Sequence, residues 1–328
     1  MTEDILCGLR DFLRPYLPLL NTHNVDYLVR DHWNTYVPEW IRRMERTNLY
    51  DALDERYQQD KSVENPFDEL LNQMVYWRRR IEQITYTHEK FEEIIGLRRD
   101  RPVSKSRVRT FMSQKKEHEV DILAPVIDQI AHLSHSDSII DYGSGRGYLG
   151  VQLAHDYHRY VLGIESCEMT VHSGEQRMKL LFKHQKESED DRRYRSTSTI
   201  VHSQTDFENL FYQTFQCHSS SFLLCGLHAC GGLSASLLYH FVRNASVRSM
   251  ANVACCYHLL EEKYSPNPFT GRCSEDDPAS FPLSRRLIDE KMSLGRNARM
   301  LAVQSLERNR ADQVSYDASE SSDCSWLL

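Results

Sequence analysis

The sequence predicts an α/β fold with a doubly wound, mostly parallel sheet, preceded by an α-helical domain. Two observations lead to this prediction. Apolar residues recur at helical spacing through the first part of the chain, where glycine is scarce. Beyond about residue 112, short apolar segments alternate with helix-like segments, as in parallel strands joined by right-handed crossovers. We therefore expect a helical domain over residues 1–110, an α/β domain over 111–308 and a disordered polar tail over 309–328.

Apolar periodicity defines the helical part. One helix is expected within residues 6–20 and another from Asn65 or Pro66 to about residue 97, because proline suits the first helical position. The inward side of the second helix would consist of Phe67, Leu70, Leu71, Met74, Trp77, Ile81 and Ile84. We interpret its aromatic residues as core packing.

The α/β part begins with a helix expected over residues 113–133. Five strands are expected at 138–141, 159–165, 198–201, 221–226 and 250–255, where short apolar runs occur. The charge-dense stretch 184–198 is expected to be an exposed loop.

Composition limits the class of protein. The 328 residues carry a net charge of -7, so no global basic field of the kind typical of nucleic-acid-binding proteins is present. Nine scattered cysteines favour a reducing compartment. The sequence shows no signal peptide and no apolar run near the roughly 20 residues that a membrane helix needs. We expect a soluble cytoplasmic or nuclear protein without membrane association.

A glycine-rich turn follows the first expected strand. It is the segment 141–147, DYGSGRG. Its glycines permit backbone torsions that residues with a side chain resist, and they let a ligand approach the main chain. Ligands of open α/β sheets bind at the carboxyl ends of the strands, where this turn lies. The expected cofactor contacts here are Gly143, Ser144, Gly145, Gly147 and Tyr148.

Asp141, two residues before the first glycine, distinguishes between two cofactor classes. A dinucleotide would place a pyrophosphate over the turn, which an aspartate would repel. S-adenosylmethionine places an ammonium and a sulfonium nearby, which a carboxylate attracts. We therefore predict S-adenosylmethionine as the cofactor and disfavour a nicotinamide-dependent oxidoreductase.

Further cofactor contacts are expected where the next strands end. Glu165 ends the second strand, where a carboxylate can accept hydrogen bonds from both ribose hydroxyls. After the third strand, Asp206 could accept the adenine amino group while Phe207 covers the ring. Asp206 could equally cap the helix that begins at Phe207. Leu227, at the end of the fourth strand, completes the expected set.

The turn after the fourth strand faces the expected position of the reactive methyl group. His228 could accept a proton from a substrate hydroxyl or amine, or could be a buried histidine bonded to the backbone. Together with Cys230, Cys255, Cys256 and His258 it suggests a zinc site. The spacing differs from the C-x₂₋₄-C or H-x₃₋₅-H pairs of structural zinc sites, and cysteines packed as small hydrophobes explain the same residues. We therefore predict no metal ion.

Several motifs occur in the same order in a known family. They are FMSQKKEHE at 111–119, DYGSGRGYL at 141–149, GLHACG at 226–231, ACCY at 254–257 and FPLS at 281–284. In these motifs the chain resembles the methyltransferase-like protein 25 family over about residues 110–308, and the helix expected at 294–307 is similar as well. The H-x-C-G and C-C motifs resemble, more distantly, the tRNA 2′-O-methyltransferases.

The resemblance implies a Rossmann-like class I methyltransferase domain that uses S-adenosylmethionine. It also places Lys115, Lys116, His118 and Glu119 where such enzymes often contact the cofactor; by residue type alone they form a polar helix start. The alternative function is a non-catalytic binding or scaffold protein that keeps the fold.

The last part of the chain departs from the family pattern. Family members continue past the helix ending near residue 307 and supply the last strands of the sheet. Here the chain turns to a polar, serine-rich end, so we expect these strands to be missing, as in a truncated or alternatively spliced form, and a sheet edge to be exposed.

The methyl acceptor and the oligomeric state are not predicted. RNA is one option for the acceptor, since the basic residues over 98–116 could contact phosphates. The same residues could form a solvated linker.

Overall fold

The computed structural model describes residues 2–23, 29–43, 49–96, 112–181, 192–265 and 276–304. The chain divides into a helical unit, Met1–His88 with Leu294–Leu328, and an α/β unit, Glu89–Ser293. This division differs from the expected one at both ends. The α/β unit begins near residue 89 rather than 111, and the segment after Ser293 belongs to the helical unit.

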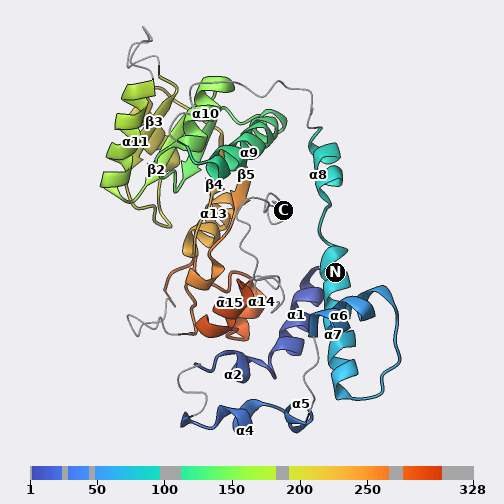
Figure 1. Cartoon of the computed structure of the whole chain (residues 1–328). Helices are drawn as coiled ribbons and strands as arrows, with labels where there is room; N and C mark the ends of the chain where they lie inside the picture. The colour runs from blue at the N-terminus through green and yellow to red at the C-terminus, as the bar shows by residue number, and fades with distance from the viewer. Residues whose placement is uncertain are drawn as a thin grey trace. The chain divides into compact units, whose positions relative to one another are not determined.

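The described helices of the helical unit range from 4 to 17 residues in length. They are α1 (Thr2–Leu13), α2 (Leu17–Leu20), α4 (His32–Tyr36), α5 (Glu39–Arg42), α6 (Leu49–Gln58), α7 (Pro66–Glu82) and α15 (Arg296–Ala302) (Figure 1). Asn65 caps α7 by accepting hydrogen bonds from the amides of Phe67 and Asp68, with Pro66 in the first turn, as predicted.

The long helix expected up to residue 97 is two helices. α7 ends at Glu82, and α8 (His88–Ile95) follows a turn. Leu71 and Val75 are the buried residues of α7, whereas Ile81 and Ile84, expected to face inward, are exposed. Apolar spacing alone did not reveal this break in the helix.

A side-chain bridge explains why α15 joins the helical unit. Asn21, just after α2, donates from Nδ2 to the carbonyl of Leu294 at 2.8 Å. In return, Asn297 Nδ2 donates to the Asn21 carbonyl at 2.9 Å, and the Ala298 amide donates to Asn21 Oδ1 at 3.3 Å. One asparagine thus binds the start of α15 through three hydrogen bonds.

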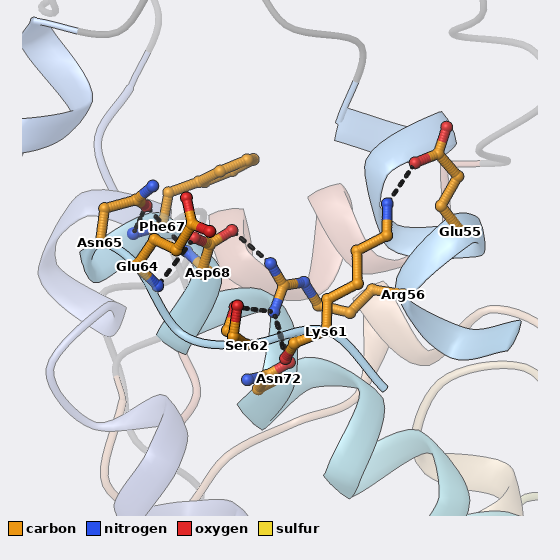
Figure 2. A network of polar contacts seen from close by, with 9 residues as sticks. All are labelled: Glu55, Arg56, Lys61, Ser62, Glu64, Asn65, Phe67, Asp68 and Asn72. Atoms are coloured by element: carbon orange, nitrogen blue, oxygen red, sulfur yellow. Dashed lines mark hydrogen bonds and ion pairs between the residues drawn. The ribbon is translucent and has the colours of Figure 1, made fainter. Parts of the chain in front are cut away.

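A buried arginine connects α6 to α7. The Arg56 side chain is 6% exposed and forms an ion pair with Asp68. Its guanidinium also donates to Asn72 Oδ1 at 2.8 Å and to the carbonyls of Lys61 and Ser62 at 3.3 and 3.4 Å (Figure 2). The planar, multidonor guanidinium suits such a cluster of acceptors, which compensates for the loss of its hydration.

The α/β unit has a parallel sheet in the strand order β3-β2-β1-β4-β5, which confirms the predicted doubly wound architecture. Within the described residues its five strands are β1 (Ser138–Tyr142), β2 (Tyr160–Glu165), β3 (Tyr194–Ser198), β4 (Phe222–Leu227) and β5 (Val247–Val253). α9 (Gln114–Leu133) precedes the first strand. The helices that join or follow the strands are α10 (Tyr148–Asp156), α11 (Glu168–Leu181), α12 (Phe207–Phe215), α13 (Gly232–Arg243), a short 3₁₀ helix (Tyr257–Leu259) and α14 (Arg285–Asp289).

Helices cover both faces of the sheet. Buried residues of α9, α10 and α11 pack on one face, and buried residues of α12 and α13 pack on the other. Successive residues of β1 point to opposite faces, so Ile139 belongs to the first core and Ile140 to the second. A strand buried on both sides reads as a continuous apolar run, which is why β1 and β4 were predicted well.

The third strand lies earlier than expected. β3 is Tyr194–Ser198 and pairs with β2 from Val161 to Glu165, whereas residues 198–201 were predicted. The strand is polar apart from Tyr194, so the apolar pattern indicated the segment after it. The expectation of an exposed loop is therefore wrong for residues 194–198. β5 also begins and ends earlier than predicted.

Several expectations concern residues outside the described ranges. These include the tail at 309–328 and most of the basic stretch at 98–116. Within the described part of the chain, no helix is long and apolar enough to cross a membrane.

Candidate cofactor and acceptor site

The glycine-rich turn folds back from β1 over the end of β2. The amides of Gly143 and Ser144 donate to the carbonyl of Ile164 at 2.9 and 3.0 Å. Gly143, Gly145 and Gly147 all have positive φ, at 74°, 55° and 71°, which favours glycine. No atom lies within 4 Å of the position that a Cβ on Gly145 would take, so the turn has an open side there.

The space beside Gly147 is occupied by a residue of β3. A Cβ at this position would lie 2.2 Å from Tyr194 Oη of β3. Gly150 and Gly163 would meet the same tyrosine at 2.4 and 2.6 Å. The buried ring of Tyr194 thus occupies the space that these three glycines leave, and burial raises the pKa of its hydroxyl. Sequence reasoning missed Tyr194 because it lay in a predicted loop.

Glu165 and the turn contact each other directly. Glu165 Oε2 accepts a hydrogen bond from the Gly145 amide at 3.1 Å, and Oε1 accepts one from the Cys167 amide at 3.0 Å. The side chain is only partly buried. Two elements predicted to hold the same cofactor, the turn and the acid after β2, therefore meet.

Asp141 is buried beneath the turn, at 2% exposure. Its Oδ1 faces the Cys225 thiol at a sulfur–oxygen distance of 3.9 Å, while Oδ2 has no hydrogen-bond partner among the described residues. Burial raises the pKa of Asp141 to about 7; the Gly150 amide lowers this pKa without reaching hydrogen-bond geometry to Oδ2, and the charge of Glu165 raises it further. A buried acceptor without a partner is costly, so this oxygen calls for an explanation.

His228 pairs with a buried carboxylate. Its Nε2 lies 2.9 Å from Oε2 of Glu119 on α9. Glu119 is buried, whereas the His228 side chain is 35% exposed. Lys115 Nζ, on the solvent side, lies 3.9 Å from Glu119 Oε1. His228 also has a positive φ of 61°, a conformation that is rare and strained for a residue with a side chain.

The pairing of His228 with Glu119 differs from the backbone-bonded histidine that was one of the two expectations. It contacts a carboxylate rather than the backbone. Because a carboxylate only accepts hydrogen bonds, Nε2 donates in this pair, and in a neutral imidazole Nδ1 is then the nitrogen with the lone pair. The sequence placed Glu119 near the site only through the family resemblance.

The remaining residues predicted to contact the cofactor are Asp206, Phe207 and Leu227, and each packs or caps within the α/β unit. Asp206 caps α12 by accepting a hydrogen bond from the Asn209 amide, which is the second of its two expected roles. Phe207 is fully buried in the core and packs edge-on against His240, so it has no exposed face with which to cover an adenine ring. Leu227 ends β4 and is partly buried against the core.

Tyr148, the first residue of α10, lies beneath two cations. The guanidinium carbon of Arg177 is 4.4 Å from its ring centroid, and Lys116 Nζ is 5.2 Å away. Cation–π contacts of this kind hold the start of α10 against α9 and α11. Of the basic stretch proposed to contact RNA, only Lys115 and Lys116 lie within the described residues.

The structure also brings together three of the residues considered for zinc. The sulfur atoms of Cys230, Cys255 and Cys256 lie within 4.8 Å of one another. They come from the loops that follow β4 and β5, beside an apolar pocket of about 220 Å³. Their spacing along the chain gave no metal motif, since the ligands come from two loops.

Comparison with known families and proteins bears on this unit. Residues 115–263 match the model of a methyltransferase domain family. These residues contain β1 to β5, the glycine turn and the His228–Glu119 pair. The match to a methyltransferase domain family therefore spans the whole sheet and the candidate site.

Two curated relatives resemble nearly the whole chain. "Probable methyltransferase-like protein 25" of Mus musculus is 23% identical over 439 aligned residues, which cover 93% of this chain and 73% of the relative. The Homo sapiens protein of the same name is 23% identical over 451 residues, with 94% and 74% covered. The expected family resemblance is thereby confirmed.

Solved structures are more distant. Coclaurine N-methyltransferase bound to N-methylheliamine and S-adenosylhomocysteine is 16% identical, with a TM-score of 0.30 and 67% of each chain covered. Magnesium protoporphyrin IX methyltransferase of Synechocystis PCC 6803, with bound S-adenosylhomocysteine, is 11% identical at a TM-score of 0.26, covering 40% of this chain and 57% of that one. The strand order, not these likenesses, establishes the fold of this chain.

Proposed function

We propose that this chain transfers a methyl group from S-adenosylmethionine to a hydroxyl or amino group of an acceptor. The observation that carries the proposal is the Asp141 carboxylate, which is buried with a free oxygen beneath a glycine turn that is open at Gly145. The match of residues 115–263 to a methyltransferase domain family supports the same function.

The charge of the site suits a cationic cofactor. Asp141 and Glu165 end adjacent strands, and within the described residues neither forms an ion pair. Burial is the main cause of the raised pKa of Asp141, and repulsion by the neighbouring Glu165 carboxylate adds to it. A ligand with an ammonium and a sulfonium group would relieve this repulsion, whereas a pyrophosphate would increase it.

The cofactor supplies an electrophilic methyl group on a sulfonium centre. The residues of this chain then have two tasks. Asp141 and Glu165 bind and orient the cofactor, so that most of the rate enhancement comes from positioning. His228, with Nε2 held by Glu119, is the candidate to accept the proton of the acceptor at Nδ1.

Calorimetry with S-adenosylhomocysteine tests the cofactor assignment. The wild-type chain should bind the ligand, and Asp141→Asn and Glu165→Gln should each weaken binding about 10- to 100-fold, because each removes a charged partner. Glu168→Gln, an exposed acid on α11, is the matched control and should leave the affinity unchanged. Absence of binding to the wild-type chain would overturn the proposal.

A second experiment separates an enzyme from a scaffold protein. Methyl transfer from labelled S-adenosylmethionine to RNA, protein and metabolite pools is measured for the wild type and for His228→Ala. The variant should retain S-adenosylhomocysteine binding and lose about 10²–10⁴-fold in transfer rate, the usual contribution of a general base. Ligand binding by the wild type without transfer to any pool would favour the scaffold alternative.

A further inference from the structure

Three thiols from two loops converge at the carboxyl edge of the sheet. Cys230 Sγ lies 2.9 Å from Cys255 Sγ, and Cys255 Sγ lies 3.5 Å from Cys256 Sγ. The loops are joined by the main chain as well. The Ala229 amide donates to the Val253 carbonyl, and the Gly231 amide donates to the Cys256 carbonyl, both at 3.2 Å. The sulfur atoms are therefore held together by a braced backbone.

These cysteines do not behave as small core hydrophobes. Cys225 on β4 is an example of that role, since it is fully buried and belongs to the core. Cys230, Cys255 and Cys256 are instead partly exposed and face one another. Thiols are weak hydrogen-bond partners, so a group of three sulfurs gains little from mutual contact. The cluster needs another explanation than packing.

A disulfide accounts for the cluster less well than a metal ion does. The 2.9 Å separation exceeds the roughly 2.05 Å of a disulfide bond, and a disulfide would leave one thiol unused. Zinc–sulfur bonds of about 2.3 Å in tetrahedral geometry place sulfurs roughly 3.8 Å apart. Outward shifts of under about 1 Å at Cys230 and Cys255 would reach that spacing.

The histidine that follows the cluster in the chain is the candidate fourth ligand, although its ring nitrogens lie outside the 4.8 Å group that the three sulfurs form. His258 lies in the 3₁₀ helix that begins directly after Cys256. Its Nδ1 is buried and has no hydrogen-bond partner among the described residues. A bound dication stabilises the thiolate form of its cysteine ligands.

We propose that Cys230, Cys255 and Cys256 bind one zinc ion, and that the His258 side chain moves toward the sulfurs on binding so that Nδ1 becomes the fourth ligand. Three thiolates and an imidazole are a ligand set of structural zinc sites. The ion would tie the loop after β4 to the loop after β5. His228 is two residues from Cys230, so the site would fix the loop that carries the acceptor-side histidine. This inference is independent of methyl transfer.

The metal content of the purified chain, prepared under reducing conditions, tests the proposal. Mass spectrometric metal analysis should find one zinc ion per chain, and Cys230→Ser, Cys255→Ser and Cys256→Ser should each lower zinc affinity by at least about tenfold. His258→Ala should lower it as well. Cys217→Ser and Cys225→Ser remove thiols outside the cluster and should retain zinc.

A second measurement covers variants that fail to fold. The wild-type chain is stripped with a chelator and reloaded with Co²⁺ alone, and a thiolate-to-cobalt charge-transfer band should appear. Alkylation should then modify three fewer thiols in the loaded chain than in the stripped chain. A folded chain that takes up neither ion, or a Cys230–Cys255 disulfide in the reduced preparation, would overturn the proposal. Unchanged affinity in His258→Ala would overturn the assignment of the fourth ligand.

Discussion

The helical unit and the α/β unit each bury a charged side chain, and the two charges differ in their partners. Arg56 donates to a carboxylate, a side-chain amide and two carbonyls (Figure 2). Asp141 has one oxygen beside a weak thiol donor and another without a partner in the described residues. A buried charge that is fully paired belongs to the structure of the unit. A buried charge that is left unpaired weakens the unit and points to a ligand.

The largest expected effect concerns the paired charge. Arg56→Met should destabilise the helical unit by about 3–5 kcal/mol, because Asp68 would stay mostly buried without its cation. Hydrogen exchange of the α6 and α7 amides measures this loss locally. The exposed Arg79, which pairs with Asp60, is the matched control, and Arg79→Met should cost less than about 1 kcal/mol. If both variants lost the same stability, the buried ion pair of Arg56 would contribute no more than the exposed pair of Arg79.

The unpaired charge should show the opposite behaviour. The pKa of Asp141 is about 7 in the folded chain and near 3.8 when unfolded, so the folded state binds the extra proton between these values. The free energy of unfolding of the wild type should therefore fall as pH rises from about 4 to 7, by a few kcal/mol. Asp141→Asn should lack this component and be at least as stable as the wild type at pH 8.

Denaturant unfolding at several pH values gives the comparison for Asp141. The difference between the wild type and Asp141→Asn isolates this one group from the other titrating residues. If Asp141→Asn is less stable than the wild type by the same amount at pH 8 as at pH 5, ionisation of Asp141 does not destabilise the fold. The carboxylate would then have a partner, and the contrast with Arg56 would be wrong.

The smallest expected effect links the unpaired charge to its ligand. If the cofactor requires ionised Asp141, the affinity for S-adenosylhomocysteine should fall by up to about tenfold for each pH unit below 7. Asp141→Asn should bind weakly with little dependence on pH over the same range. Calorimetry at about pH 5.5, 6.5 and 8, values on both sides of the pKa of Asp141, would measure this affinity. If the affinity of the wild type does not change with pH over this range, cofactor binding does not depend on the ionisation of Asp141.

Local sequence was enough to predict much of the α/β unit. β1, the glycine turn and Glu165 follow each other closely, and buried parallel strands have a clear apolar signature. The helix start at Pro66 and the helix beginning after Ser113 were likewise predicted from adjacent residues. By contrast, the polar edge strand β3 has no such signature, and its position was predicted too late in the chain.

Contacts between distant segments could not be read in the same way. Glu119 and His228 are joined only when α9 packs beside the end of β4. The thiol cluster depends on two loops brought together by β4 and β5, so spacing rules for metal ligands did not apply. Phe207 was expected to cover an adenine ring because it follows the third expected strand beside Asp206, whereas the core that α12 and α13 share with the sheet encloses it.

The space beneath the glycine turn is shared between the turn and the edge strand. Gly147, Gly150 and Gly163 each lack the side chain that would collide with Tyr194, so four positions from different elements divide one volume. A change at any one of them alters the room left for the others. The positions of these glycines therefore make room for a large residue on β3, and those in the turn also let a cofactor approach the main chain. A smaller residue at 194 would leave a void next to Asp141, where the buried carboxylate would gain access to water.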